Sequence, residues 1–144
     1  MRVLILHGPN LNLLGTREPE IYGHLTPKDI KAVLVEHCPE LKLDFFQSNH
    51  EGVLIDKLHA VVRSHDGVVF NAAAFTHYSY ALRDAIAAID LPVVEVHLSN
   101  PDEREDFRKV NVIRDVCVAH YQGRGIDSYK DAVDYFSNLV GYDW

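Results

Sequence analysis

The amino-acid sequence predicts a doubly wound α/β fold, in which a parallel sheet is covered by helices on both faces. Five short apolar segments alternate with segments whose apolar residues recur at helical spacing. All but one of the connections are short, and the chain contains no internal repeat or Pro/Ser-rich linker. This alternation requires crossover connections, which produce a parallel sheet that is buried on both sides. We therefore expect residues 1–144 to form a single domain with five strands.

The first strand and the first helix are indicated by their composition and by their ends. Residues 3–6 are continuously apolar, as in a strand buried on both faces, and the turn sequence His-Gly-Pro-Asn follows them. Thr26 is a typical N-cap, and Pro27 fits the first turn of the helix that it opens. We expect this helix to end near Pro39.

The middle of the chain repeats the strand and helix pattern twice. Residues 41–47 are the second predicted strand, after which Asn49 can cap a helix, and residues 67–70 are the third strand. Thr76, or a residue near it, is expected to open the third helix. The apolar residues at helical spacing are Leu54, Leu58, Val61 and Val62 in the second helix, and Ala81, Leu82, Ala85, Ala88 and Ile89 in the third.

The last third of the chain completes the alternation. Residues 91–96 predict the fourth strand, and a short helical turn follows around residues 103–108. Residues 115–119 predict the fifth strand, and residues 129–140 carry the apolar pattern of a final helix.

Composition and charge exclude several classes of partner. Lys and Arg number 14 against 21 Asp and Glu, a formal charge of −7 without a basic stripe, so we expect no nucleic acid. No apolar run approaches the roughly 20 residues that span a bilayer, and no signal peptide is visible, so we expect no membrane association. Cys38 and Cys117 lack CxxC spacing, which suggests buried thiols in a reducing cytoplasm. The expected partner is a small molecule.

The one long connection, residues 8–25, is the first place to look for function. A connection of this length in a compact α/β domain is usually functional, and it contains Arg17, Tyr22 and several glycines. The alternative is a flexible surface loop without a role.

Polar side chains follow three of the predicted strands. In an open parallel sheet the ligand crevice lies beyond the carboxyl ends of the strands, where the strand order reverses. Asn10 follows the first strand, Asn71 the third and His97 the fourth, with Arg108 shortly after. Asparagine donates and accepts hydrogen bonds, histidine moves protons near neutral pH and arginine binds carboxylates or hydroxyls. Each could instead be a turn or cap residue, but their combination favours a site.

Other functions of doubly wound folds lack their residues here. A phosphoacceptor receiver needs acidic residues after the first strand, and a flavin mononucleotide site needs a Ser/Thr-rich loop there, but the sequence is His-Gly-Pro-Asn. Neither GxGxxG nor GxxxxGK[ST] is present, which argues against a nucleotide. Leu54 stands where an HExxH motif starting at His50 would place its second histidine, so we expect no metal.

Three long stretches carry a family resemblance: LHGPNLNLLGTREPEIYG at residues 6–23, FNAAAFTHYSYALRDAI at residues 70–86 and EVHLSNPDEREDFR at residues 95–108. Together they resemble type II 3-dehydroquinate dehydratase, also called type II dehydroquinase. The resemblance implies a flavodoxin-like fold and the dehydration of 3-dehydroquinate to 3-dehydroshikimate in the shikimate or quinate pathway. It also implies that the enzyme uses no cofactor.

The resemblance assigns catalytic roles to five residues. Tyr22 would remove the proton α to the substrate ketone, and because a free phenol titrates near about 10, Arg17 would favour its phenolate. Asn10 would stabilise the enolate through a bound water. His97 would protonate the departing hydroxyl, with Glu95 holding its other ring nitrogen. An acid and a base on different segments suit an anti elimination.

The resemblance also assigns substrate contacts and an assembly. It places the substrate carboxylate near Asn71 and the backbone of Leu98 and Ser99, and the ring hydroxyls near His77 and Arg108. Asp84 would reach the site of an adjacent subunit, which implies a trimer and a homododecamer of four trimers. His77 and Asp84, seven residues apart on one predicted helix, would face the same side, which also fits a surface pair without a ligand.

Two other hypotheses concern the chemistry. An unrelated enzyme type performs the same reaction through a desolvated lysine that forms a Schiff base, but all lysines of this chain except Lys109 lie on predicted helix or strand segments that look solvated, so we expect no imine intermediate. A catalytically silent relative would bind a polyhydroxy acid or serve as an assembly subunit. Such a protein would not need Tyr22, Arg17, Asn10 and His97 together.

Some positions depart from the family pattern. His7 replaces the usual asparagine and Ala72 a frequent proline, and residues 109–111 stand where histidine and serine are common. Residues 120–125 are more polar than usual. None of these changes removes a proposed catalytic group, and we expect Asn111 and Arg114 to affect subunit contacts instead.

Overall fold

One five-stranded parallel sheet runs through the molecule. The computed structural model describes residues 1–16 and 18–140. The strands lie in the order β2-β1-β3-β4-β5, and every neighbouring pair is parallel. They are β1 (Arg2–His7), β2 (Lys42–Gln47), β3 (Gly67–Asn71), β4 (Val93–His97) and β5 (Ala119–Gln122). This order confirms the predicted doubly wound, flavodoxin-like fold and places the switch point beside β1.

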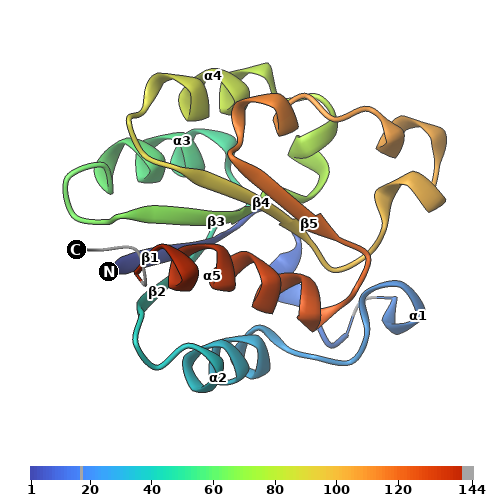
Figure 1. Ribbon diagram of the computed structural model, residues 1–144. Helices are drawn as coiled ribbons and strands as arrows, with labels where there is room; N and C mark the ends of the chain where they lie inside the picture. The colour runs from blue at the N-terminus through green and yellow to red at the C-terminus, as the bar shows by residue number, and fades with distance from the viewer. Residues whose placement is uncertain (17, 141–144) are drawn as a thin grey trace.

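Helices cover both faces of the sheet (Figure 1). The helices α3 (Glu51–Ala60) and α4 (Tyr80–Ala88) lie on one face, and α2 (Pro27–His37) and α5 (Ile126–Val140) lie on the other. Alternate side chains of β1 enter two separate cores, Val3 and Ile5 on the face of α2 and α5, and Leu4 and Leu6 on the opposite face. Burial on both faces explains why the strand is continuously apolar.

The predicted start of the first long helix is confirmed. The Thr26 hydroxyl accepts a hydrogen bond from the backbone N–H of Asp29, and the Asp29 carboxylate accepts one from the backbone N–H of Thr26, each at 3.1 Å. This reciprocal capping box satisfies two donors that the first turn leaves unpaired. The helix ends at His37, close to the predicted Pro39.

The predicted cap of α3 is wrong. The helix begins after His50, and Asn49 is used elsewhere. The Asn49 side-chain oxygen accepts hydrogen bonds from the backbone N–H of Asn10 and from the side chain of Gln47, both at 2.9 Å. Asn49 therefore supports the turn after β1 and does not cap the helix.

The cap of α4 is a residue near Thr76, as the prediction allowed, and not Thr76 itself. Ser79 caps this helix, because its hydroxyl accepts a hydrogen bond from the backbone N–H of Leu82. Thr76 lies in a preceding 3-10 helix, η2 (Ala73–His77). The predicted apolar stripe holds at Leu82 and Ala85, whereas Ala81 and Ala88 are exposed.

The fifth strand starts later than predicted. Its register with β4 runs from Val94 opposite Ala119 to His97 opposite Gln122. The residues before it form a 3-10 helix, η5 (Arg114–Val116), instead of a strand. Asp115 pairs there with Arg83 of α4, and such polar contacts leave no trace in an apolar pattern.

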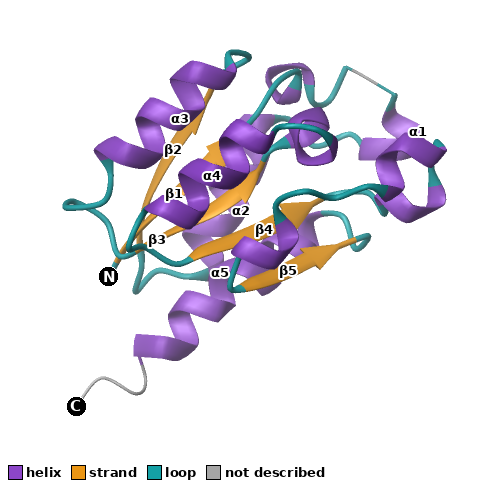
Figure 2. Ribbon diagram, turned by 90° about the horizontal axis from the view of Figure 1, so that it is seen from above, coloured by secondary structure: helices purple, strands orange, loops and turns teal. Residues whose placement is uncertain are grey.

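The remaining short elements lie at the carboxyl end of the sheet (Figure 2). The long connection contains η1 (Leu11–Leu13) and α1 (Pro19–Tyr22), so it is not a structureless loop. The helical turn after β4 consists of η3 (Pro101–Glu103) and η4 (Asp106–Lys109).

The two cysteines differ in exposure. Cys38 is buried as predicted, whereas Cys117 is only half-buried, and both are free thiols. Burial raises the pKa of each thiol to about 12.

No helix in the described part of the chain has both the length and the apolar character needed to cross a bilayer.

Candidate active site

A cleft lies at the carboxyl ends of β1, β3 and β4, as the switch-point rule predicts. Loops after all three strands contribute to its lining, and α1 adds Tyr22 from the long connection. Most of the predicted site residues line it, namely Asn10, Tyr22, Asn71, His77, His97, Leu98, Ser99 and Arg108.

Three predicted site residues are not among those that line the cleft. Glu95 is fully buried directly behind His97. Asp84 is exposed on α4, and the expectation that it shares a helix face with His77 is wrong, because η2 ends at His77 and α4 starts three residues later. Arg17 lies outside the described residues.

His97 and Glu95 form a buried pair at the end of β4. The Nε2 atom of His97 donates to a Glu95 carboxylate oxygen at 2.6 Å, and the side chains of His97 and Glu95 are 8% and 0% exposed. The two residues are separated by one position on the strand, so both side chains point to the same face of the sheet. This bond holds the imidazole in one orientation and leaves Nδ1 for chemistry.

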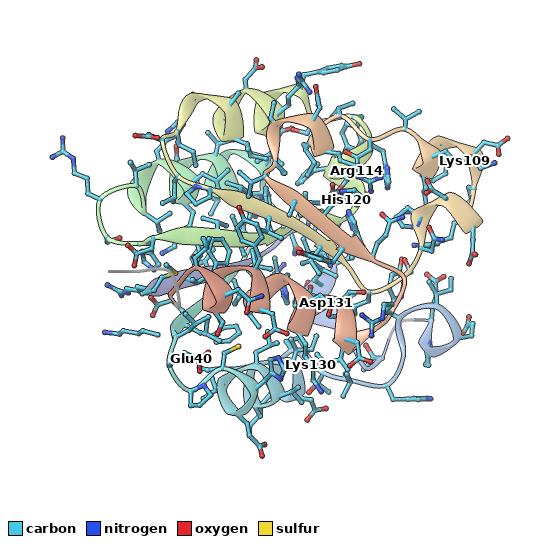
Figure 3. All side chains as sticks on the ribbon, viewed as in Figure 1. Glu40, Lys109, Arg114, His120, Lys130 and Asp131 are labelled. Carbon is cyan, nitrogen blue, oxygen red and sulfur yellow. The ribbon has the colours of Figure 1, made fainter. Side chains whose placement is uncertain are left out.

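Glu95 is held as a carboxylate by several donors. Burial alone would raise its pKa, but the hydrogen bond from His97, the charges of His97 and Arg114 and a hydrogen bond from Asn111 lower it to about 2. Asn111 donates to the carboxylate at 2.6 Å and Arg114, labelled in Figure 3, at 3.2 Å. Within this chain, Asn111 and Arg114 thus contact the predicted acid pair, a role that the sequence analysis did not foresee.

Two cleft residues have left-handed backbone conformations. Asn10 has φ 68° and Ala73 has φ 52°, values that cost a non-glycine residue about 1 kcal/mol or more. The backbone N–H of Ala73 donates to the side-chain oxygen of Asn71 at 3.1 Å, and the backbone of Asn10 is held by Asn49. Strain that is retained by specific hydrogen bonds is typical of a functional site.

His77 has a fixed tautomer. Its Nδ1 donates to the carbonyl oxygen of Val110 at 2.7 Å, which leaves Nε2 as the acceptor when the ring is neutral. Burial lowers the pKa of His77, and the carbonyl contact opposes this shift only in part. A neutral imidazole can accept a hydrogen bond from a ligand hydroxyl.

Arg104 is the cleft residue that the sequence analysis missed. Its guanidinium carbon lies 5.1 Å from the centre of the Tyr22 ring, and both residues line the cleft. Among the described residues, the Arg104 Nε is one of two buried side-chain polar atoms without a hydrogen-bond partner. Arg104 follows η3 and precedes η4, so no helical spacing relates it to Arg108, and the sequence offered no signal for its place in the cleft.

A possible ligand set for a metal lies on the other side of the molecule. Donor atoms of His37, Cys38 and Asp134 lie within 4.8 Å of one another. The three side chains are already hydrogen-bonded to one another. One carboxylate oxygen of Asp134 lies 2.9 Å from the Nε2 of His37, and the same oxygen accepts from the Cys38 thiol at 3.6 Å. None of the three lines the cleft, so they have no part in the site described above.

A model of the class II dehydroquinase family matches residues 1–137 of this sequence. The chain belongs to the class II dehydroquinase family. A 3-dehydroquinate dehydratase of Bacillus licheniformis is 54% identical over 138 residues, covering 94% of this chain and 95% of the relative. A catabolic 3-dehydroquinase 1 of Fusarium vanettenii is 49% identical over 135 residues, covering 92% and 94%.

Solved structures agree with this membership. The crystal structure of type II dehydroquinase from Butyrivibrio crossotus superposes with a TM-score of 0.92 at 41% identity, covering 95% of this chain and 97% of that one. The family resemblance inferred from the three motifs is thereby confirmed, and the chain is an enzyme of the 3-dehydroquinate dehydratase type. The reaction of this dehydroquinase family is the dehydration of 3-dehydroquinate in the shikimate pathway.

Proposed function

We propose that this dehydroquinase converts 3-dehydroquinate to 3-dehydroshikimate by an anti elimination through an enolate, without a Schiff base, cofactor or metal. One observation carries the proposal: Tyr22 and His97, a base and an acid, line one cleft from different segments of the chain. Their separation on α1 and β4 allows the proton and the hydroxyl to leave from opposite faces of the substrate.

Tyr22 acts as the base in this proposal. The Arg104 guanidinium carbon lies 5.1 Å from the centre of the Tyr22 ring, so a positive charge stands beside the proposed base. We assign the same role to Arg17 on the basis of the resemblance, as a stabiliser of the transition state. The phenolate takes the proton α to the ketone, and the electron pair of that C–H bond becomes the enolate.

Asn10 and His97 complete the elimination. Asn10 stabilises the enolate charge through a water, because prepositioned donors stabilise a charge as it develops. The enolate then collapses, the C1–O bond breaks, and the imidazolium of His97 gives its Nδ1 proton to the hydroxyl, which leaves as water. Glu95 supports this step, since a carboxylate at Nε2 stabilises the imidazolium and fixes its orientation.

The remaining cleft residues bind the substrate. We assign the substrate carboxylate to Asn71 and the backbone of Leu98 and Ser99. The carbonyl groups of Leu98 and Ser99 already accept hydrogen bonds from residues that follow β5. His77 and Arg108 are assigned to the ring hydroxyls.

The proposal extends to the assembly and its setting. Residues 1–144 act as one domain, and Asp84, exposed on α4, completes the site of an adjacent subunit in a trimer. Four such trimers form the homododecamer, which works in the cytoplasm. The product serves aromatic biosynthesis in the shikimate pathway or the breakdown of quinate.

Three competing hypotheses are less well supported. No lysine is present among the described residues that line the cleft, which disfavours a lysine Schiff base. A silent binder would need neither the buried pair of His97 and Glu95 nor a cation beside Tyr22. A receiver or flavin function would place other residues at the strand ends.

The direct test is turnover of 3-dehydroquinate by the purified chain after treatment with a chelator, followed by the ultraviolet absorbance of the new conjugated enone. We expect turnover that added divalent metal leaves unchanged. Addition of borohydride during turnover should attach no substrate to the protein. Absence of turnover from the folded chain at several pH values would contradict the proposal and favour the silent binder, and covalent trapping would contradict its mechanism.

A further inference from the structure

A line of buried hydrogen bonds leads from the end of β1 to Asn71 in the cleft. The side-chain nitrogen of Asn71 lies 3.0 Å from the Tyr129 hydroxyl, and this hydroxyl lies 2.9 Å from the Nε2 of His7. Tyr129 is fully buried, Asn71 is 4% exposed and His7 is 6% exposed. These three side chains come from β3, α5 and β1, so the line joins the sheet to a covering helix.

The direction of each bond follows from its neighbours. The Asn71 side-chain oxygen accepts from the backbone N–H of Ala73, which identifies the other terminal atom as the amide nitrogen. That nitrogen can only donate, so the Tyr129 oxygen accepts from it. The other described contact of the Tyr129 hydroxyl is His7 Nε2, which must accept the hydroxyl hydrogen if this buried donor is to be paired. His7 is therefore unprotonated at Nε2.

Burial favours the same assignment. Desolvation lowers the pKa of His7 to about 4, so the ring is neutral and can accept a hydrogen bond at neutral pH. Burial also raises the pKa of Tyr129, so its hydroxyl stays protonated and can donate a hydrogen bond. The rings of His7 and Tyr129 meet edge to face at an interplanar angle of 87°, which restricts both.

We propose that Tyr129 and His7 are positioning residues that fix the carboxamide of Asn71 and leave its second N–H for the substrate carboxylate. A planar carboxamide that is bonded at its oxygen by Ala73 and at its nitrogen by Tyr129 cannot rotate. The direction of the remaining N–H is then set before substrate arrives. This inference rests on the proposed role of Asn71 in binding.

The strand register supports the same arrangement. His7 and Asn71 are paired at the ends of β1 and β3, and the backbone N–H of Gly8 donates to the carbonyl oxygen of Asn71 at 2.8 Å. His7 stands where the family motif usually has asparagine, whose side-chain oxygen is also an acceptor. Position 7 thus supplies an acceptor for the hydrogen bond that the Tyr129 hydroxyl donates.

The experiment compares Tyr129→Phe with Tyr135→Phe in steady-state turnover of 3-dehydroquinate. Tyr135 is the matched control, because it lies on the same helix and packs against the same core. Loss of the Tyr129 hydroxyl should raise KM about tenfold, the effect of one buried hydrogen bond, and change kcat by less than about twofold. The control should change neither constant. Thermal unfolding of both variants checks that they are folded.

A second set of variants separates positioning from general destabilisation. His7→Leu should raise KM, whereas His7→Asn should keep the KM of the parent because the acceptor is restored. When Asn71 is already alanine, the addition of Tyr129→Phe should not raise KM further, since the two side chains act as one unit. If Tyr129→Phe does not fold, the pair of His7 variants provides the same test.

Three results would overturn the inference: an unchanged KM in Tyr129→Phe, an equal rise in Tyr135→Phe, or a rise that persists when Asn71 is alanine. Failure of the proposed function would look different, because the parent chain itself would show no turnover. In that case calorimetric binding of 3-dehydroquinate to the same variants replaces KM, and equal dissociation constants would overturn the inference.

Discussion

The two walls of the cleft are built in different ways. We call Asn71, His97 and the buried Glu95 behind His97 the sheet wall, because all three residues lie on strands. We call residues 9–16 and 18–25 the loop wall, which carries Asn10 and Tyr22. The sheet wall is buried and each of its side chains has a hydrogen-bonded partner, whereas none of the four residues of α1 is buried.

The difference separates two tasks. The proposed acid and the proposed carboxylate contact belong to the folded core, so their geometry is set when the sheet forms. The proposed base belongs to a short helix that contributes little to the core. Changes in the sheet wall should therefore reduce both stability and activity, whereas changes at Tyr22 should reduce activity alone.

The largest expected effect on stability is that of Glu95→Gln. The substitution removes a fully buried charge to which His97, Asn111 and Arg114 all donate, which should cost about 3–5 kcal/mol in the free energy of unfolding. Urea unfolding at pH 7 measures this. The control is Asp115→Asn, which removes an exposed carboxylate paired with Arg83 and should cost less than about 1 kcal/mol. Equal losses in the two variants would contradict the account of the sheet wall.

Acid should weaken the support behind the sheet wall through His7. Its pKa is about 6.5 in the unfolded chain and is lowered to about 4 by burial, so its neutral form is favoured by folding. The contribution is fully present above pH 6.5 and is lost as pH falls toward 4, by up to about 3 kcal/mol. Between pH 6.5 and 4 the His7→Asn variant should therefore lose up to about 3 kcal/mol less free energy of unfolding than the parent protein loses. Parallel urea midpoints for the two proteins between pH 7 and 4 would contradict the prediction.

A smaller effect on the free energy of unfolding is expected for a substitution at the start of α2, which follows the loop wall. Thr26→Ala removes the capping-box hydroxyl and should lower the free energy of unfolding by about 1 kcal/mol. Because Thr26 is not among the residues that line the cleft, kcat should stay within about twofold of the parent value. Thermal unfolding together with a turnover assay checks both statements, and a large loss of kcat would show that the cap positions Tyr22.

Local patterns predicted much of the fold. The continuous apolar run of β1 and the Thr26 cap each depend on neighbouring residues, and both are confirmed. The start of β5 was wrong because Arg114 and Asp115 make contacts with Glu95 and Arg83. These partners are 19 and 32 residues away, a separation that periodicity cannot detect.

The sequence also predicted part of the candidate site, namely which residues lie at the strand ends, but not the contacts between distant segments. The strand-end rule and the motifs placed Asn10, Asn71 and His97 at one cleft, where the structure brings them together. The motifs did not reveal the position of Arg104 over Tyr22, because a contact between two loops depends on their tertiary arrangement. The line from His7 through Tyr129 was missed for the same reason, since its members are 122 residues apart.

The central claim is that the base lies on a short helix at the edge of the core while the acid is buried at the end of a central strand. The most direct test is the kcat of Tyr22→Phe, measured beside its free energy of unfolding. The account predicts that kcat falls by a factor on the order of 100 or more, the contribution of a general base. The free energy of unfolding should change by less than about 0.5 kcal/mol, because the substitution keeps the partly buried ring that packs at the edge of the core. Near-parental turnover in the folded variant would contradict the claim.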